Sequence, residues 1–162
     1  MWPRSCLKKG ITVRNLFFVA FCDETGLDFK RAVQLSAPFG GGMGRLREVC
    51  GAVTAMFMIA GIKYGYTSPQ EDELKAEHYK LIQTLAYKFR KQNGSYLCRE
   101  LLGLDGADNP IPEKRSDQYY QTRPCSSLVA NAAELMDEFI LGGNRVAATQ
   151  KSSHFPDDDR RG

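Results

Sequence analysis

The chain has 162 residues, of which 43% are hydrophobic and 25% are charged, a composition typical of one globular domain with its own core. Its 22 Lys and Arg residues nearly balance 19 Asp and Glu residues, so the net charge of +3 argues against a nucleic-acid partner. No apolar stretch approaches the roughly 20 residues that a membrane-spanning helix needs, so we also expect no membrane partner.

Two helices are predicted at the beginning of the chain. The first should cover residues 13–24 and end at Gly26, because glycine favours the left-handed conformation that closes a helix. Asp28 can then cap a second, shorter helix over residues 29–37, which Pro38 helps to end.

A glycine-rich segment and an apolar helix follow. Residues 39–44 contain four glycines and predict a loop between helices. The next helix is predicted over residues 48–64. Its segment 52–62 is apolar nearly all round, so we expect it to be the central buried helix.

The next long helix has a start signal in its sequence. Ser68 can cap it, Pro69 suits the first helical position, and Glu71 completes a capping box. This helix should end at Asn93, since a glycine comes next.

The last third of the chain is predicted to hold two more helices and a long loop. Ser95 should cap a short helix over residues 96–102, and the polar, proline-containing stretch 104–124 is predicted to be a loop. A helix over residues 125–141 then ends at two glycines, and residues 142–162 form a predicted disordered tail.

The fold class expected from these elements is all-α. We predict a single compact multi-helix domain of about six helices with a glycine-rich interhelical loop, spanning residues 10–141.

The five cysteines are widely separated, and their number is odd. Their spacing excludes CxxC redox pairs, zinc-ribbon knuckles and the attachment motif of c-type haem. A disulfide-rich secreted scaffold would be shorter and denser in cysteine, so we expect reduced thiols and a cytoplasmic location. The cysteines are Cys6, Cys22, Cys50, Cys98 and Cys125.

Three of these thiols fall at predicted helix starts, namely Cys50, Cys98 and Cys125. The free N–H groups and partial positive charge of a helix N-terminus stabilise a thiolate and lower a cysteine pKa below about 8.5. The alternative is that these residues only fill space, since free cysteine is often buried. Cys22 is predicted to be such a core residue, and Cys6 belongs to the chain terminus.

The glycine-rich segment has two interpretations. It is either a tight turn that lets the backbone pass close to a neighbour, or a loop that shapes a pocket around Cys50. The glycines concerned are Gly40, Gly41, Gly42, Gly44 and Gly51.

Several of these segments together resemble the C_GCAxxG_C_C family, whose redox role is inferred from its cysteines. The resemblance implies a small α-helical bacterial or archaeal domain with a redox-active site. Family members have an early Asn-Cys pair that falls here on Thr12-Val13, so the first family cysteine is missing. The segments are 39–45 (FGGGMGR), 48–54 (EVCGAVT), 61–65 (GIKYG), 98–103 (CRELLG), 123–125 (RPC) and 131–134 (NAAE).

These observations leave three functional hypotheses. In the first, Cys50, Cys98 and Cys125 are catalytic: two form a reversible disulfide and the third attacks or resolves it, as in a thiol–disulfide oxidoreductase or an electron-transfer protein. In the second, the same cysteines bind zinc or an iron–sulfur cluster. In the third, the protein is a non-catalytic helical interaction module with a decayed redox site.

The three hypotheses differ in cofactor and partner. The cofactor is zinc, an iron–sulfur cluster or none. The candidate partners are a redox partner protein, a small thiol and a second copy of the chain in a homodimer.

Overall fold

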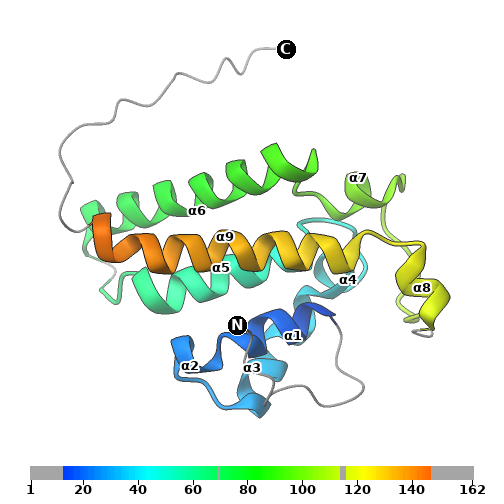
Figure 1. The fold of residues 1–162 in the computed structure, drawn as a ribbon, viewed down its shortest axis with the longest axis horizontal. Helices are drawn as coiled ribbons and strands as arrows, with labels where there is room; N and C mark the ends of the chain where they lie inside the picture. Colours follow the sequence, from blue (N-terminus) through cyan, green and yellow to red (C-terminus); the bar gives the residue numbers. More distant parts are fainter. Residues whose placement is uncertain (1–12, 69, 114–115, 147–162) are drawn as a thin grey trace.

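The computed structural model describes residues 13–68, 70–113 and 116–146. These residues form helices and no β-strand, which confirms the predicted all-α class (Figure 1). The elements in chain order are α1 (Val13–Ala20), α2 (Cys22–Thr25), α3 (Phe29–Ser36), the 3-10 helix η2 (Ala37–Phe39), α4 (Gly40–Met43), α5 (Gly51–Tyr64), α6 (Asp72–Asn93), α7 (Cys98–Leu102), α8 (Asp117–Gln121) and α9 (Cys125–Val146).

The three long helices α5, α6 and α9 pack against one another along their length (Figure 1). Helix α1 packs on α5, α9 and α3, so α5 is enclosed between the long helices and the N-terminal ones. This position agrees with its apolar sequence. The largest fully buried side chains are Phe17, Phe18, Phe89, Met56, Ile59, Leu85, Met136, Val19 and Val53.

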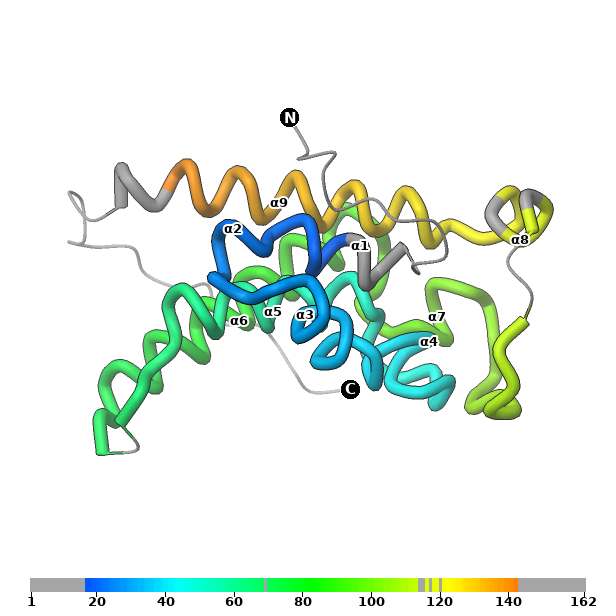
Figure 2. The backbone as a smooth tube through the Cα atoms, turned by 90° about the horizontal axis from the view of Figure 1, so that it is seen from below, coloured from blue at the N-terminus to red at the C-terminus, as the bar shows by residue number. Residues whose placement is uncertain are grey.

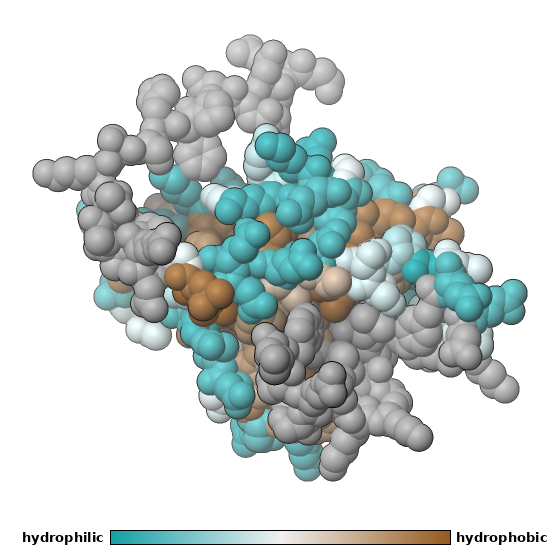
Figure 3. Space-filling view, viewed as in Figure 1, coloured by the Kyte–Doolittle hydropathy of each residue, from teal (hydrophilic) through white to brown (hydrophobic). Residues whose placement is uncertain are grey.

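The short helices α4, α7 and α8 gather at one end of this bundle, at the right in Figures 1 and 2. Hydrophilic side chains cover much of the face seen in Figure 3, with apolar ones showing between them. None of the helices in the described ranges is long and apolar enough to cross a membrane.

In the N-terminal part, the structure confirms one predicted helix boundary and contradicts another. Asp28 caps α3 as predicted, since its Oδ1 accepts a hydrogen bond from the backbone N–H of Arg31 at 3.0 Å. The single helix predicted over residues 13–24 is wrong, because Phe21 leaves helical geometry and divides it into α1 and α2. Packing of α2 on α5 redirects the chain there.

The predicted start of α6 is also wrong. The helix begins at Asp72, after Glu71, whose side chain makes no capping hydrogen bond. The Ser68 hydroxyl donates to Oε1 of Gln70 at 2.9 Å, a local hydrogen bond in place of the predicted helix cap.

The C-terminal half differs from the prediction in two places. The loop predicted over residues 104–124 contains α8, whose cap Ser116 accepts a hydrogen bond from the N–H of Tyr119 at 3.2 Å. Helix α9 continues through Gly142 to Val146, past the predicted end at 141, because glycine weakens a helix by only about 1 kcal/mol. The rest of the predicted tail, 147–162, lies outside the described residues, as does Cys6.

Candidate functional site

A cavity of about 250 Å³ lies at the end of the bundle where α4, α7 and the starts of α5 and α9 meet. Cys50, Cys98 and Cys125 all line it, although they are far apart in the sequence. The structure therefore brings the three predicted site cysteines to one cavity. Cys22 lies elsewhere, half-buried against the hydrophobic core, where the sequence predicts a core residue.

Backbone hydrogen bonds hold the segments of Cys50 and Cys98 together. The N–H of Cys50 donates to the carbonyl of Tyr96 at 2.9 Å, and the N–H of Cys98 donates to the carbonyl of Glu48 at 2.6 Å. An isolated antiparallel bridge between Val49 and Leu97 lies between these two bonds. This extended pairing explains why the helix predicted from residue 48 begins only at Gly51.

The thiol of Cys50 sits at the start of α5 but does not behave as the sequence predicts. Burial raises its pKa to about 11, and the neighbouring Cys98 and Cys125 raise it further. Hydrogen bonds from the backbone of Ala52 and Val53 lower the pKa without overcoming the burial. The predicted lowering of the pKa by a helix N-terminus is therefore wrong for Cys50.

Cys98 is the first residue of α7, two positions later than the predicted helix start. Its side chain is buried, and its Sγ accepts a hydrogen bond from Nη1 of Arg47 at 3.9 Å. Ser95 does not cap the helix itself, since its hydroxyl accepts from the N–H of Leu97, just before the first helical residue. Cys98 therefore has a permanent positive charge beside its sulfur.

All five predicted loop glycines line the cavity, and Gly42 shows why glycine is needed there. The segment predicted as a loop is the short helical turn α4, with left-handed backbone at Gly41 and Gly42. A Cβ atom on Gly42 would lie 2.5 Å from Cβ of Cys98 and 2.9 Å from the backbone nitrogen of Glu48. The backbone thus passes close to a neighbour, and that neighbour is a site cysteine. The lining glycines are Gly40, Gly41, Gly42, Gly44 and Gly51.

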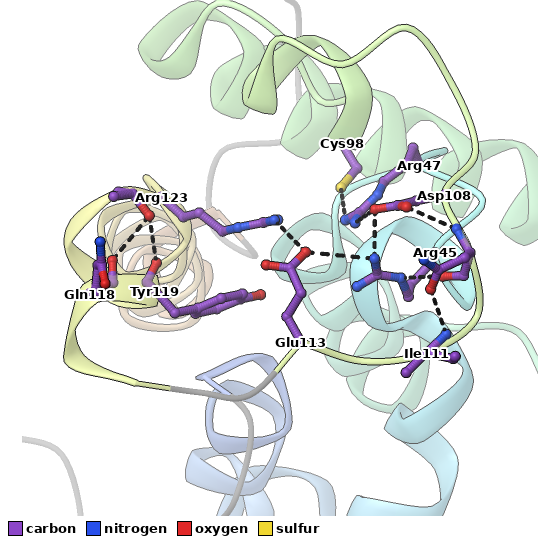
Figure 4. Close-up of polar contacts among 11 residues, drawn as sticks. Arg45, Arg47, Cys98, Asp108, Ile111, Glu113, Gln118, Tyr119 and Arg123 are labelled. Carbon is purple, nitrogen blue, oxygen red and sulfur yellow. Dashed lines mark hydrogen bonds and ion pairs between the residues drawn. The ribbon is translucent and has the colours of Figure 1, made fainter.

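Sequence reasoning missed a network of three arginines and two carboxylates at the cavity (Figure 4). Asp108 pairs with Nη2 of Arg45 at 2.6 Å and with Nη2 of Arg47 at 2.8 Å. Glu113 pairs with Nη2 of Arg123 at 2.8 Å and with Nη2 of Arg45 at 3.6 Å. The one available signal was the pair of arginines just before Cys50, in a chain whose overall charge is nearly balanced.

Arg47 is the most buried member of this network, with 2% of its surface exposed. Burial opposes its charge, but hydrogen bonds to Asp108 and Cys98 outweigh it and raise the pKa of the guanidinium. The same pairing with Arg47 lowers the pKa of Asp108. The Nε of Arg47 is buried without a hydrogen-bond partner in the structure, so one donor of this guanidinium is unsatisfied.

The donor arrangement does not fit a metal centre. Within the described ranges, no three or more His, Cys, Asp or Glu side chains are grouped so that they could hold a metal ion. Structural zinc and iron–sulfur sites usually take four protein ligands. We therefore derive no metal-dependent step for Cys50, Cys98 and Cys125.

A family model described as "Putative redox-active protein (C_GCAxxG_C_C)" matches residues 15–139. The chain belongs to this family. No curated protein and no solved structure matches the chain. The matched range of the C_GCAxxG_C_C family includes the three cavity cysteines.

Proposed function

We propose that the protein exchanges thiols and disulfides, and that Cys98 is the attacking residue. The observation that carries this proposal is the 3.9 Å contact between Sγ of Cys98 and Nη1 of the buried Arg47, in a cavity lined by two further thiols. A thiolate is the nucleophile in disulfide exchange, and a neighbouring arginine favours it. Membership of a redox-associated family supports the same class of chemistry.

The charges at the site support this role of Cys98. Arg45, Arg47 and Arg123 carry three positive charges, whereas Asp108 and Glu113 carry two negative ones. The network is therefore left with one positive charge, and Arg47 places part of it next to the Cys98 sulfur.

The proposed reaction has two steps. The Cys98 thiolate attacks one sulfur of a substrate disulfide, forming a mixed disulfide and releasing the other half as a thiolate that takes a proton from water. A second cavity thiol then loses its proton to water and attacks the Cys98 sulfur, so an intramolecular disulfide forms and the second half of the substrate leaves. This second half also leaves as a thiolate and takes a proton from water. Counting the proton already released when Cys98 ionised, the protein loses two electrons and two protons, and the two halves of the substrate gain them as free thiols.

We assign this second attack to Cys125. Burial raises the pKa of Cys50 to about 11, so its thiol is a poor nucleophile at neutral pH. Reduced thiols that react in this way suit the cytoplasm, with a small thiol or a redox partner protein restoring the dithiol.

The test is oxidation of the reduced protein by bis-hydroxyethyl disulfide, followed by mass spectrometry of the unreduced peptides. We expect a Cys98–Cys125 disulfide in the parent protein and in Cys22→Ser, the matched control outside the cavity. Cys98→Ser should lose the reaction, and Cys125→Ser should stop at the mixed disulfide. Equal oxidation rates for the parent and Cys98→Ser would refute the assignment.

The protonated state of Cys50 favours a second candidate, the non-catalytic helical module with a decayed redox site. This alternative predicts that no pair among Cys50, Cys98 and Cys125 becomes a disulfide under the same conditions. The oxidation experiment therefore separates the two functions directly.

A further inference from the structure

We infer that the disulfide substrate is a small molecule with a carboxylate group, which replaces the Glu113 side chain between Arg45 and Arg123. This inference rests on the proposed function and adds the class of substrate to it. It is carried by the size of the cavity, the position of Glu113 and the buried, unsatisfied Nε donor of Arg47.

The cavity is suited to a small ligand. Its volume of about 250 Å³ is below the roughly 300–1,000 Å³ of pockets that hold drug-sized molecules. The same walls carry three thiols and three guanidinium groups, so one ligand can meet both kinds of group at once. A disulfide with short acidic arms has this combination of chemistry and size.

Glu113 already shows where a carboxylate binds. Figure 4 shows its carboxylate between the guanidinium groups of Arg123 and Arg45, with Oε1 at 2.8 Å and 3.6 Å from their Nη2 atoms. The Glu113 side chain is 46% exposed, whereas those of Arg45 and Arg123 are 14% and 19% exposed. The Glu113 carboxylate is thus the accessible partner of the two arginines. Its 3.6 Å separation from Nη2 of Arg45 is longer than a hydrogen bond. A ligand carboxylate that contacts both guanidinium groups more closely can therefore displace it.

Two further contacts orient these arginines toward an anion. Nε of Arg45 donates to the carbonyl of Asn109 at 2.5 Å, and the guanidinium carbon of Arg123 lies 4.8 Å from the centroid of the Tyr119 ring. Both side chains are therefore held in place before a ligand arrives, which reduces the entropy cost of binding.

Arg47 adds the independent observation. It lines the cavity with 2% of its surface exposed, and its Nε has no hydrogen-bond partner in the structure. Together with Arg45 and Arg123 it outnumbers the two carboxylates of the network, so the cavity is positive. It therefore attracts an anionic ligand and repels a cationic one.

The test compares three disulfides that differ in charge. Dithiodiglycolate carries two carboxylates, bis-hydroxyethyl disulfide is neutral, and cystamine carries two ammonium groups. The rate at which each oxidises the full-length protein is divided by its rate with mercaptoethanol, which removes differences in intrinsic reactivity. We expect the corrected rate for dithiodiglycolate to exceed that for the neutral disulfide about tenfold, with cystamine the slowest, because a positive site steers anions.

Variants then locate the effect. Arg123→Gln should reduce the ratio of the anionic to the neutral rate toward one, whereas Glu113→Gln should raise this ratio by removing the competing carboxylate. Arg90→Gln, an exposed position on α6 outside the cavity lining, is the matched control and should leave the ratio unchanged. Glu113 is exposed, so its variant keeps the test decisive even if Arg123→Gln does not fold.

Two results overturn the inference. If the neutral disulfide oxidises the protein but the corrected anionic rate is no faster, or if the Arg123 and Glu113 variants keep the parent ratio, the carboxylate site is refuted and the exchange function stands. If none of the three disulfides oxidises the cavity thiols, the proposed function itself fails and the inference fails with it.

Discussion

The close approach of the Gly42 backbone to Cys98 predicts a large and specific cost for Gly42→Ala. The new Cβ would lie 2.5 Å from Cβ of Cys98, 2.9 Å from the nitrogen of Glu48 and 3.0 Å from the carbonyl carbon of Arg47. The neighbours are a buried side chain and backbone, so the overlap should cost about 1–3 kcal/mol. The left-handed φ of +69° adds about 1–2 kcal/mol. We expect a loss of about 2–5 kcal/mol in the free energy of unfolding.

Gly26 provides the matched control. Its φ is +67°, but a Cβ atom there would meet nothing within 4 Å, so Gly26→Ala should lose only the backbone part of about 1–2 kcal/mol. The assay is urea unfolding of both variants and the parent under reducing conditions. Alkylation of Cys98 should also become faster in Gly42→Ala, because the buried thiol has to move. Equal losses for the two variants would refute the packing argument.

Three further predictions concern single groups. Alkylation of Cys50, followed by mass spectrometry, should become about tenfold faster per pH unit and continue to rise until about pH 11; a plateau at the ordinary cysteine value of about 8.5 would contradict the effect of burial. The pKa of Asp108 is lowered, so its contribution to stability is present above the ordinary value of about 3.9 and is lost as the pH falls through the lower folded value. The urea midpoint of the parent should therefore fall more steeply in acid than that of Asp108→Asn, and parallel curves would contradict this. Asn131→Ala removes the 2.7 Å bond from its Nδ2 to Oδ1 of Asn93 between α9 and α6 and should cost about 1 kcal/mol in urea unfolding; a loss no larger than that of the exposed Glu134→Ala would show that the bond contributes nothing.

Local signals account for what the sequence predicts well. Asp28 has a short side chain that can accept a hydrogen bond directly before a helix, and the nearly all-apolar sequence of α5 predicts that the helix is buried. The same local reasoning fails at Phe21, at Ser68 and at Gly142, where contacts elsewhere in the fold or a weak glycine penalty decide the boundary. These failures move the ends of helices and do not change the fold class.

The site required the tertiary structure. The sequence by itself determined the all-α class, most of the longer helices and the three cysteines near helix starts, because each depends on residues close together in the chain. Only the fold decided that Cys50 and Cys98 lie on paired backbone segments, that burial raises the pKa of Cys50, and that three arginines share the cavity with the thiols. The physical reason is that burial, ion pairing and close packing depend on distances in space. The residues that meet in the cavity are far apart in the sequence, and their spacing follows no helical pattern that a sequence could reveal.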